Sequence, residues 1–282
     1  MPDVPACLVS VIIPAYNAEK FVAAAISSAL AQGIENCEIL VVNDGSSDRT
    51  AEVLSQFADQ PTVKILTHPG GINRGVCASR RLALEQARGE FIAFLDADDE
   101  YLPGKLQRHI GLLREKTNAI AVHSGVELKS QQGGNDNPWQ PAFDLGPEPR
   151  LYDLKREKYF LRRNHICNST IVCRRSALQP DRDLPSYMVA GYEDWIIVTC
   201  LGTRGLFYYD PQPTVIYLVH PSSYSTSLYQ RSGLIELNFI EFYLTMIPRL
   251  PGFLMKLRAC LALLVKLVRL ARLRSSQSAS EK

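Results

Sequence analysis

Residues 91–100 read FIAFLDADDE, in which five apolar or small residues precede four acids placed within five positions. So short an apolar run is typical of a strand that is buried on both faces of a sheet. The acids at its end are either a solvated turn or a group that holds a positive charge. The residues at the ends of the other strands decide between these alternatives.

The first hundred residues repeat this pattern of short apolar strands separated by helical stretches. Strands are predicted at 8–13 (LVSVII), 38–42 (EILVV) and 63–66 (VKIL). The helices are predicted to start at Asn17 as N-cap and stop at Gly33, to start after the caps Ser46 and Ser47, and to cover 75–88. This alternation predicts an α/β fold with a mostly parallel, doubly wound sheet. Ligands bind outside the carboxyl ends of the strands in such sheets.

The second half of the chain is less regular. We expect a loop at 131–149, a strand at 169–175, a helix at 191–205 and a strand that begins at 214. From 234 onward the sequence looks helical, and 275–282 is predicted to be a frayed polar tail. The expected organisation is one α/β domain over 1–230 and a C-terminal helical extension over 231–282.

Composition excludes several classes of protein. A net charge of +2 argues against a nucleic-acid partner bound by bulk charge. The seven cysteines are scattered singly, which argues against a zinc site or a disulfide framework. An acid and two prolines stand in the first five residues, where a signal peptide requires basic residues, so a cytoplasmic protein is expected.

Four segments follow one another along the chain and together form a specific pattern: VSVIIPAYN, ILVVNDGSSDRT, NRGVCASRRLALEQARGEFIAFLDADD and GYEDW. Together they resemble the family 2 glycosyltransferases, which are inverting enzymes with the GT-A fold, and the resemblance covers roughly 8–225. It implies transfer of a sugar from a nucleotide donor, a UDP-sugar, to a glycan or lipid-linked acceptor of the bacterial cell envelope. A nucleotidyltransferase that forms an activated sugar and a non-catalytic nucleotide-sugar-binding relative are the alternatives.

The resemblance assigns the nucleotide pocket to the ends of the first two strands. Pro14, Tyr16 and Asn17 would line this pocket, and Asp44 would accept a hydrogen bond from the base. A carboxylate is a suitable acceptor for the N–H of a base edge.

The segment NRGVCASR supplies two further candidates for the nucleotide pocket. Asn73 matches the family's Asn-x-Gly segment. Arg80 would face the ribose or the diphosphate, with a place on the surface as the alternative.

Asp96 and Asp98 match the family's DxD motif. Asp98 would bind a divalent cation, Mg²⁺ or Mn²⁺, on the donor's diphosphate, with Asp96 against the ribose or the water on the metal. Asp99 is expected to be a dispensable cap or supporting group. His220 is either a supporting metal ligand or an ordinary loop histidine, whereas the other four histidines are expected to be structural.

The resemblance makes Asp194 of GYEDW the general base and gives Glu193 an orienting role. From the residues alone, the better explanation of both acids is a favourable negative charge at a helix N-terminus. Trp195 would either stack on a sugar or fill the core.

Residues 253–274 are strongly apolar yet carry six cations and no acid. Their longest uninterrupted apolar run, 259–265, is too short to cross a bilayer. We expect a basic amphipathic helix on the inner face of the plasma membrane, which would make the enzyme peripheral and its acceptor lipid-linked. The alternative is a helix that packs on its own domain or on a partner subunit.

Overall fold

The computed structural model describes residues 8–130, 145–157, 161, 164–184, 192–221 and 232–280. The predicted loop at 131–149 lies mostly outside these residues, as does Gly191 at the expected start of a helix. The six cysteines in the described ranges are free thiols.

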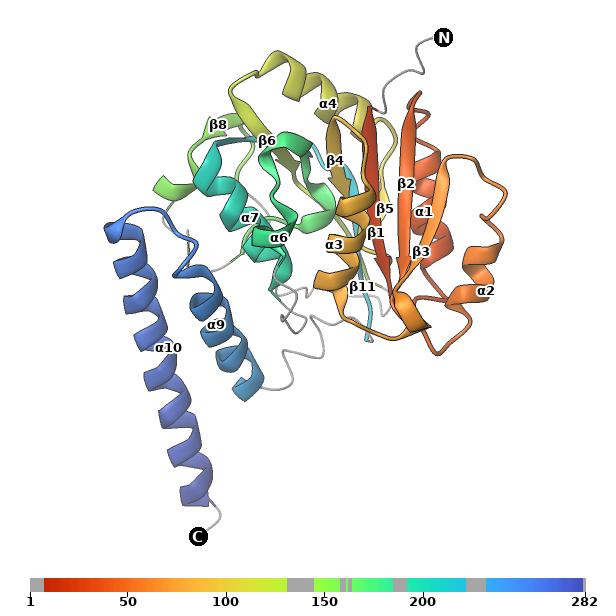
Figure 1. Cartoon of the computed structure of the whole chain (residues 1–282). Coiled ribbons are helices and arrows are strands. Elements are labelled where there is room, and N and C mark those ends of the chain that lie inside the picture. Colours follow the sequence, from red (N-terminus) through yellow and green to blue (C-terminus); the bar gives the residue numbers. More distant parts are fainter. Residues whose placement is uncertain are drawn as a thin grey trace.

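The central sheet has eight strands in the order β3-β2-β1-β4-β9-β6-β10-β8 (Figure 1). They are β1 (Val9–Ala15), β2 (Cys37–Asn43), β3 (Val63–Thr67), β4 (Phe91–Phe94), β6 (Ala119–Ser124), β8 (Arg150–Tyr152), β9 (Val172–Arg174) and β10 (Leu206–Asp210). Pairing is antiparallel where β9 lies between β4 and β6, and where β8 meets β10. The other four pairings are parallel, so the predicted mostly parallel α/β fold is confirmed.

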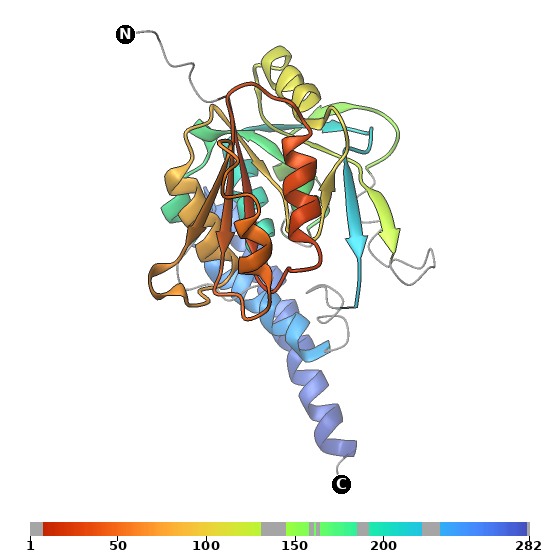
Figure 2. The same ribbon diagram turned by 90° about the vertical axis from the view of Figure 1, so that its right-hand side faces the viewer.

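A smaller three-stranded sheet lies beside the first. It has the order β5-β11-β7, with β5 (Glu100–Tyr101), β7 (Glu127–Ser130) and β11 (Val215–Val219). Figure 2 shows β7 and β11 running side by side. This sheet matters for the site because β5 directly follows the acids at 96–99, and β11 leads to His220.

Helices cover both faces of the large sheet. They are α1 (Val22–Leu30), α2 (Thr50–Ser55), α3 (Val76–Gln86), α4 (Lys105–Glu115), α6 (Pro180–Asp183), α7 (Glu193–Arg204), α9 (Ser232–Met246) and α10 (Phe253–Ser280). Short 3₁₀ turns are η1 (Pro69–Gly71), η2 (Leu154–Arg156), η3 (Asn168–Thr170) and η4 (Arg175–Ala177). No helix in the ranges listed above combines the length and the apolar character needed to cross a membrane.

The alternation of side chains along β1 explains the two layers. Ile12 packs in an apolar cluster with residues of α3, α7 and α9, whereas Val11 and Ile13 pack in a second cluster with residues of α1 and α4. A strand whose successive side chains are buried on opposite faces needs helices on both sides, which is the doubly wound arrangement.

Three local predictions are wrong. Asn17 is not an N-cap, because α1 begins at Val22 and Asn17 has φ +48° in the preceding loop. Ser46 and Ser47 are not caps either, since α2 begins at Thr50. The predicted polar tail is helical up to Ser280.

Candidate active site

The register of the sheet brings the predicted site segments to one edge. Ala15 of β1 lies opposite Asn43 of β2, and Ile12 lies opposite Phe94 of β4. Because these strands are parallel, Asp44 and Asp96 emerge at the same edge as the loop after β1. The expectation that the polar strand ends converge is therefore confirmed.

Asp44 is buried, and it holds the loop that leads into α3. Its Oδ1 accepts the backbone N–H of Arg74 at 2.7 Å, and its Oδ2 accepts that of Gly75 at 2.9 Å. Nε2 of His68 lies 3.4 Å from Oδ1. The carboxylate of Asp44 therefore fixes the backbone of the loop that includes Asn73. Its contact with the base stays a prediction.

The glycine after Asp44 permits this close approach. Gly45 has φ +67°, and a Cβ there would lie 2.4 Å from the backbone nitrogen of Asn73. Both the left-handed backbone and the lack of space require glycine. The signal DG after a strand thus marks a point where two loops touch.

The loop after β1 is tied to the loop after β2. Oδ1 of Asn17 accepts the backbone N–H of Ser47 at 2.8 Å, and the N–H of Asn17 donates to Oγ of Ser46 at 3.1 Å. Beside it, Tyr16 is 52% exposed and Pro14 is half-buried. Hydrogen bonds therefore hold these two loops together, and the ring of Tyr16 beside them is accessible to a ligand.

Arg80 links the two groups of acids. Its guanidinium is only 2% exposed and donates to Asp96 and to Glu193, at 2.6 Å in both cases. Asp96 follows β4 and Glu193 begins α7, so the arginine of α3 joins segments 97 residues apart. The alternative of a surface place for Arg80 is wrong, and its guanidinium contacts acids where the resemblance implied ribose or diphosphate.

Asp99 is an internal support. It is 2% exposed, accepts the hydroxyl of Ser169 at 2.5 Å, and accepts the backbone N–H of Leu218 at 3.2 Å. Burial raises the pKa of this carboxyl well above its usual range. The expectation of a supporting group is confirmed, but a buried carboxyl with two partners is not dispensable to the fold.

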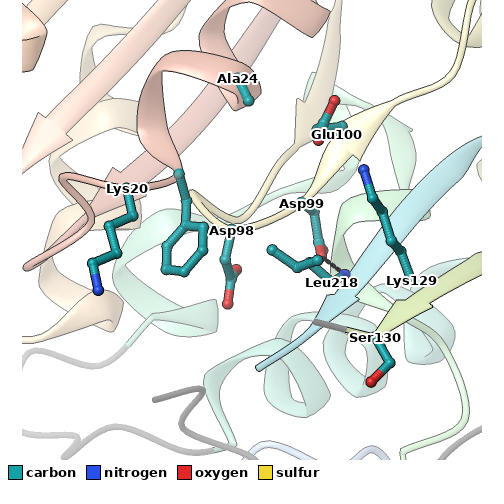
Figure 3. Close-up of a pocket in the computed structure, with 9 residues that line it drawn as sticks. Lys20, Ala24, Asp98, Asp99, Glu100, Lys129, Ser130 and Leu218 are labelled. Atoms are coloured by element: carbon teal, nitrogen blue, oxygen red, sulfur yellow. Dashed lines mark hydrogen bonds between the residues drawn. The ribbon is translucent and has the colours of Figure 1, made fainter. Parts of the chain in front are cut away.

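Asp98 points away from that support and meets His220. Its Oδ2 lies 3.1 Å from Nε2 of His220, whose ring lies 4.4 Å from that of Phe21. Asp98 lines a hollow of about 230 Å³ together with Lys20 and Lys129 (Figure 3). The late histidine thus reaches back to the DxD segment, as the resemblance implied.

The acid–histidine pair is a sparse donor set. Among the residues that the structure describes, no three His, Cys, Asp or Glu side chains come together as a complete metal cage. One carboxylate and one imidazole fit a cation that takes its remaining ligands from substrate oxygens, as Mg²⁺ commonly does. Asp98 and His220 therefore fit a divalent cation whose other ligands are oxygen atoms of the substrate.

Asp194 sits at the start of α7 next to Glu193. Its Oδ2 accepts the side-chain amide of Asn164 at 2.8 Å, and its Oδ1 accepts the N–H of Trp195. Burial, and then the charge of Glu193, raise the pKa of Asp194 to about 7, although Arg80 opposes the rise. A carboxyl that titrates near neutrality is suited to accept and release protons.

Trp195 belongs to the core. It is 2% exposed, and its ring stacks on Phe242 of α9 with centroids 3.6 Å apart. The alternative of a sugar-stacking platform is therefore wrong.

Sequence reasoning missed several residues of the network. Asn168 donates to Asp96, Ser169 accepts the N–H of Asp96 and binds Asp99, and Asn164 holds Asp194. His68 was expected to be merely structural, yet it lies against Asp44. No motif marks these residues, because each acts only through a neighbour that is distant in sequence.

Comparison with known proteins bears on this arrangement. The family model described as "Glycosyl transferase family 2" matches residues 10–180. Over 121 residues the chain is 40% identical to WfgD of Escherichia coli, and the match covers 43% of this chain and 46% of WfgD. WfgD is described as UDP-Glc:alpha-D-GlcNAc-diphosphoundecaprenol beta-1,3-glucosyltransferase. An uncharacterized glycosyltransferase of Haemophilus influenzae is 29% identical over 227 residues, which cover 78% of this chain and 68% of that protein. The chain spans about half the length of several curated relatives, WfgD included.

Solved structures show the same fold. The S. aureus TarS 1-349 fragment in complex with UDP superposes with a TM-score of 0.63 at 19% identity, and covers 92% of this chain and 70% of that chain. The complex of the same fragment with UDP-GlcNAc gives 0.63 at 18% identity, with 92% and 71% covered. The GT-A fold is thus shared at low sequence identity.

Proposed function

This chain belongs to glycosyl transferase family 2, and on that premise we propose that it transfers a sugar from a UDP-sugar to a glycan or lipid-linked acceptor with inversion at the anomeric carbon. The observation that carries the proposal is the bridge from Asp96 through Arg80 to Glu193. It joins the acids after β4, where the donor would bind, to the start of α7, where Asp194 would act on the acceptor.

The donor would bind along the strand ends. Tyr16, exposed at the end of β1, offers an aromatic face to a base, with Pro14, Asn17 and Asn73 around it. Asp44 would accept the N–H of the base. We propose uridine as that base because TarS was solved with UDP and UDP-GlcNAc, and because the description of WfgD begins with UDP-Glc.

Asp98 and His220 would hold a divalent cation, Mg²⁺ or Mn²⁺, against the donor's diphosphate. When bound, such a cation neutralises the negative charge that grows on the leaving nucleoside diphosphate. Asp96 would remain paired with Arg80, and from that position it would contact the ribose or a water molecule on the metal.

Asp194 would take the proton of the acceptor hydroxyl as that hydroxyl attacks the anomeric carbon. Its pKa of about 7 leaves about half of the carboxyl ionised at neutral pH, and the amide of Asn164 fixes its orientation. Glu193 would act indirectly, because its charge helps to raise that pKa while its carboxylate stays on Arg80. A direct displacement of this kind inverts the anomeric configuration.

The acceptor is proposed to be lipid-linked, with the reaction at the inner face of the plasma membrane. The description of WfgD includes a diphosphoundecaprenol, which is a lipid carrier. The apolar and cationic C-terminal helix provides a second, independent reason.

The test is UDP binding measured by calorimetry with Mn²⁺, with Mg²⁺ and with EDTA. We expect tight binding only with the cation, and loss of that dependence in Asp98→Ala. The matched control is Glu115→Gln, at an exposed acid of α4, which should bind like the wild type. Equal binding of UDP by Asp98→Ala and wild type would refute the metal proposal, whereas UDP binding without release of UDP from any UDP-sugar would indicate a non-catalytic relative.

A further inference from the structure

Helix α10 uses one side to pack on its own chain. Met255, Ala259, Ala262 and Leu263 join the apolar cluster that includes α9. On the same side, Nζ of Lys266 lies 3.4 Å from the ring centroid of Phe239 in α9. One face of this segment therefore packs on its own chain, mainly on α9 of the same C-terminal extension, and Lys266 belongs to that face.

The opposite side of α10 exposes large apolar side chains. Apart from the adjacent Phe253 and Leu254, its members recur at intervals of three or four residues, so they form one stripe along the helix. They are Phe253 (79% exposed), Leu254 (65%), Leu257 (42%), Leu261 (56%), Leu264 (57%) and Val268 (48%). We call this surface the outer stripe. So many exposed apolar side chains in a row are unusual on a soluble surface and indicate an interaction site.

Cations border the outer stripe, and the sequence of α10 contains no acid. Lys256, Arg258 and Arg269 are exposed on α10. The sequence contains no Asp or Glu between 242 and 280. A partner must therefore be apolar at its centre and negatively charged around it.

A second copy of this chain does not meet that requirement. Pairing two outer stripes would bring the cations of both helices together with no acid to offset them. An anionic lipid surface does meet it, because acyl chains receive the apolar side chains while phosphates lie at the level of the cations. The shape agrees, since α10 runs beside α9 and continues past it, away from the sheets (Figures 1 and 2).

We propose that the outer stripe of α10 docks this protein on a bilayer that contains anionic lipid, with the helix lying along the interface. The proposal goes beyond sugar transfer, because it names the surface that binds and the side of the helix that enters the lipid. The apolar side chains supply most of the binding, and each of the three exposed cations adds about fivefold on an anionic surface.

The experiment is cosedimentation of the full chain with vesicles of phosphatidylcholine alone and with vesicles that also contain phosphatidylglycerol. It needs neither donor nor acceptor, so its failure is separate from failure of the proposed catalysis. We expect binding to the anionic vesicles, and at least a tenfold loss in the triple variant Leu257→Glu/Leu261→Glu/Leu264→Glu. Arg258→Gln/Arg269→Gln should lose about 25-fold on anionic vesicles and little on neutral ones. Leu151→Glu, at an exposed leucine of β8, is the matched control and should bind like the wild type.

Circular dichroism checks that each variant is folded. Equal vesicle binding by the folded triple variant and the wild type would overturn the proposal. The proposal would also be overturned if the wild type bound no vesicles but formed a dimer, and if the triple variant abolished that dimer. The outer stripe would then be the interface with a second copy of this chain.

Discussion

Replacing Asp194 by asparagine should abolish activity and at the same time stabilise the protein at alkaline pH. In the folded protein the pKa of this carboxyl is raised to about 7, chiefly by burial, from an ordinary value of 3.8. The folded state therefore binds more protons than the unfolded state between these values, so stability falls as pH rises through that window. Each pH unit of difference is worth about 1.4 kcal/mol, which makes the ionised carboxylate unfavourable to folding by roughly 4 kcal/mol at pH 8.

Asparagine keeps the shape of the side chain and removes this penalty. We expect the free energy of unfolding of Asp194→Asn to exceed that of the wild type by up to about 4 kcal/mol at pH 8, and by less than about 2 kcal/mol at pH 5. Urea denaturation at the two pH values measures both differences. Asp181→Asn is the matched control, because Asp181 is exposed on the surface and should change stability little at either pH.

Activity should change in the opposite direction. UDP release from UDP-glucose and UDP-GlcNAc, with water as the acceptor, can be followed without knowledge of the natural acceptor. The wild-type kcat/KM should rise with pH through an apparent pKa near 7 and fall to about a tenth of its plateau at pH 6. A kcat/KM that is flat between pH 5.5 and 8.5, or an Asp194→Asn variant that is active and no more stable than the wild type at pH 8, would rule out Asp194 as the base.

Two further substitutions test the supports of the site by urea denaturation. Arg80→Met should lower the free energy of unfolding by roughly 3 kcal/mol, since it leaves the largely buried Glu193 unpaired and removes the partner of Asp96. The neighbouring Arg81→Met removes only surface pairs and should cost under about 1 kcal/mol. Equal costs for the two variants would contradict the bridge through Arg80. Gly45→Ala should cost at least about 2 kcal/mol more than Gly33→Ala, because both glycines have positive φ but only the former would place a Cβ against the backbone of Asn73. Similar losses at the two glycines would show that the loops can separate.

The fold of the first half could be predicted because local signals agree there. Strands such as β1 and β2 are mostly apolar, and a helix separates each from the next strand as expected, although α1 is shorter than predicted. Parallel strands put their carboxyl ends at one edge, so Asp44 and Asp96 could be placed together without knowledge of any contact. The boundaries were less predictable, since Asn17 and Ser46 have the side chains of caps but use them to join two loops.

The supports of the site could not be predicted, because they depend on tertiary contacts. Asn164 lies 30 residues from Asp194, and Ser169 lies 70 residues from Asp99. Neither residue belongs to a periodic pattern or to a motif. Trp195 illustrates the same limit, since only the position of α9 decides that its ring is covered by Phe242.

Arg80 shows how the fold can alter a function that a motif implies. Asp96, Glu193 and Asp194 come from two distant segments, and their mutual repulsion would oppose that approach in a partly buried site. One guanidinium bonds to Asp96 and Glu193, and its charge opposes the rise in the pKa of Asp194, which burial and the charge of Glu193 still hold at about 7. If Arg80 turned to a donor phosphate, it would leave the largely buried Glu193 without a counter-charge, and Asp96, whose side chain is 33% exposed, without its partner. The contacts of Arg80 are therefore better explained by a structural link between the segment after β4 and the start of α7.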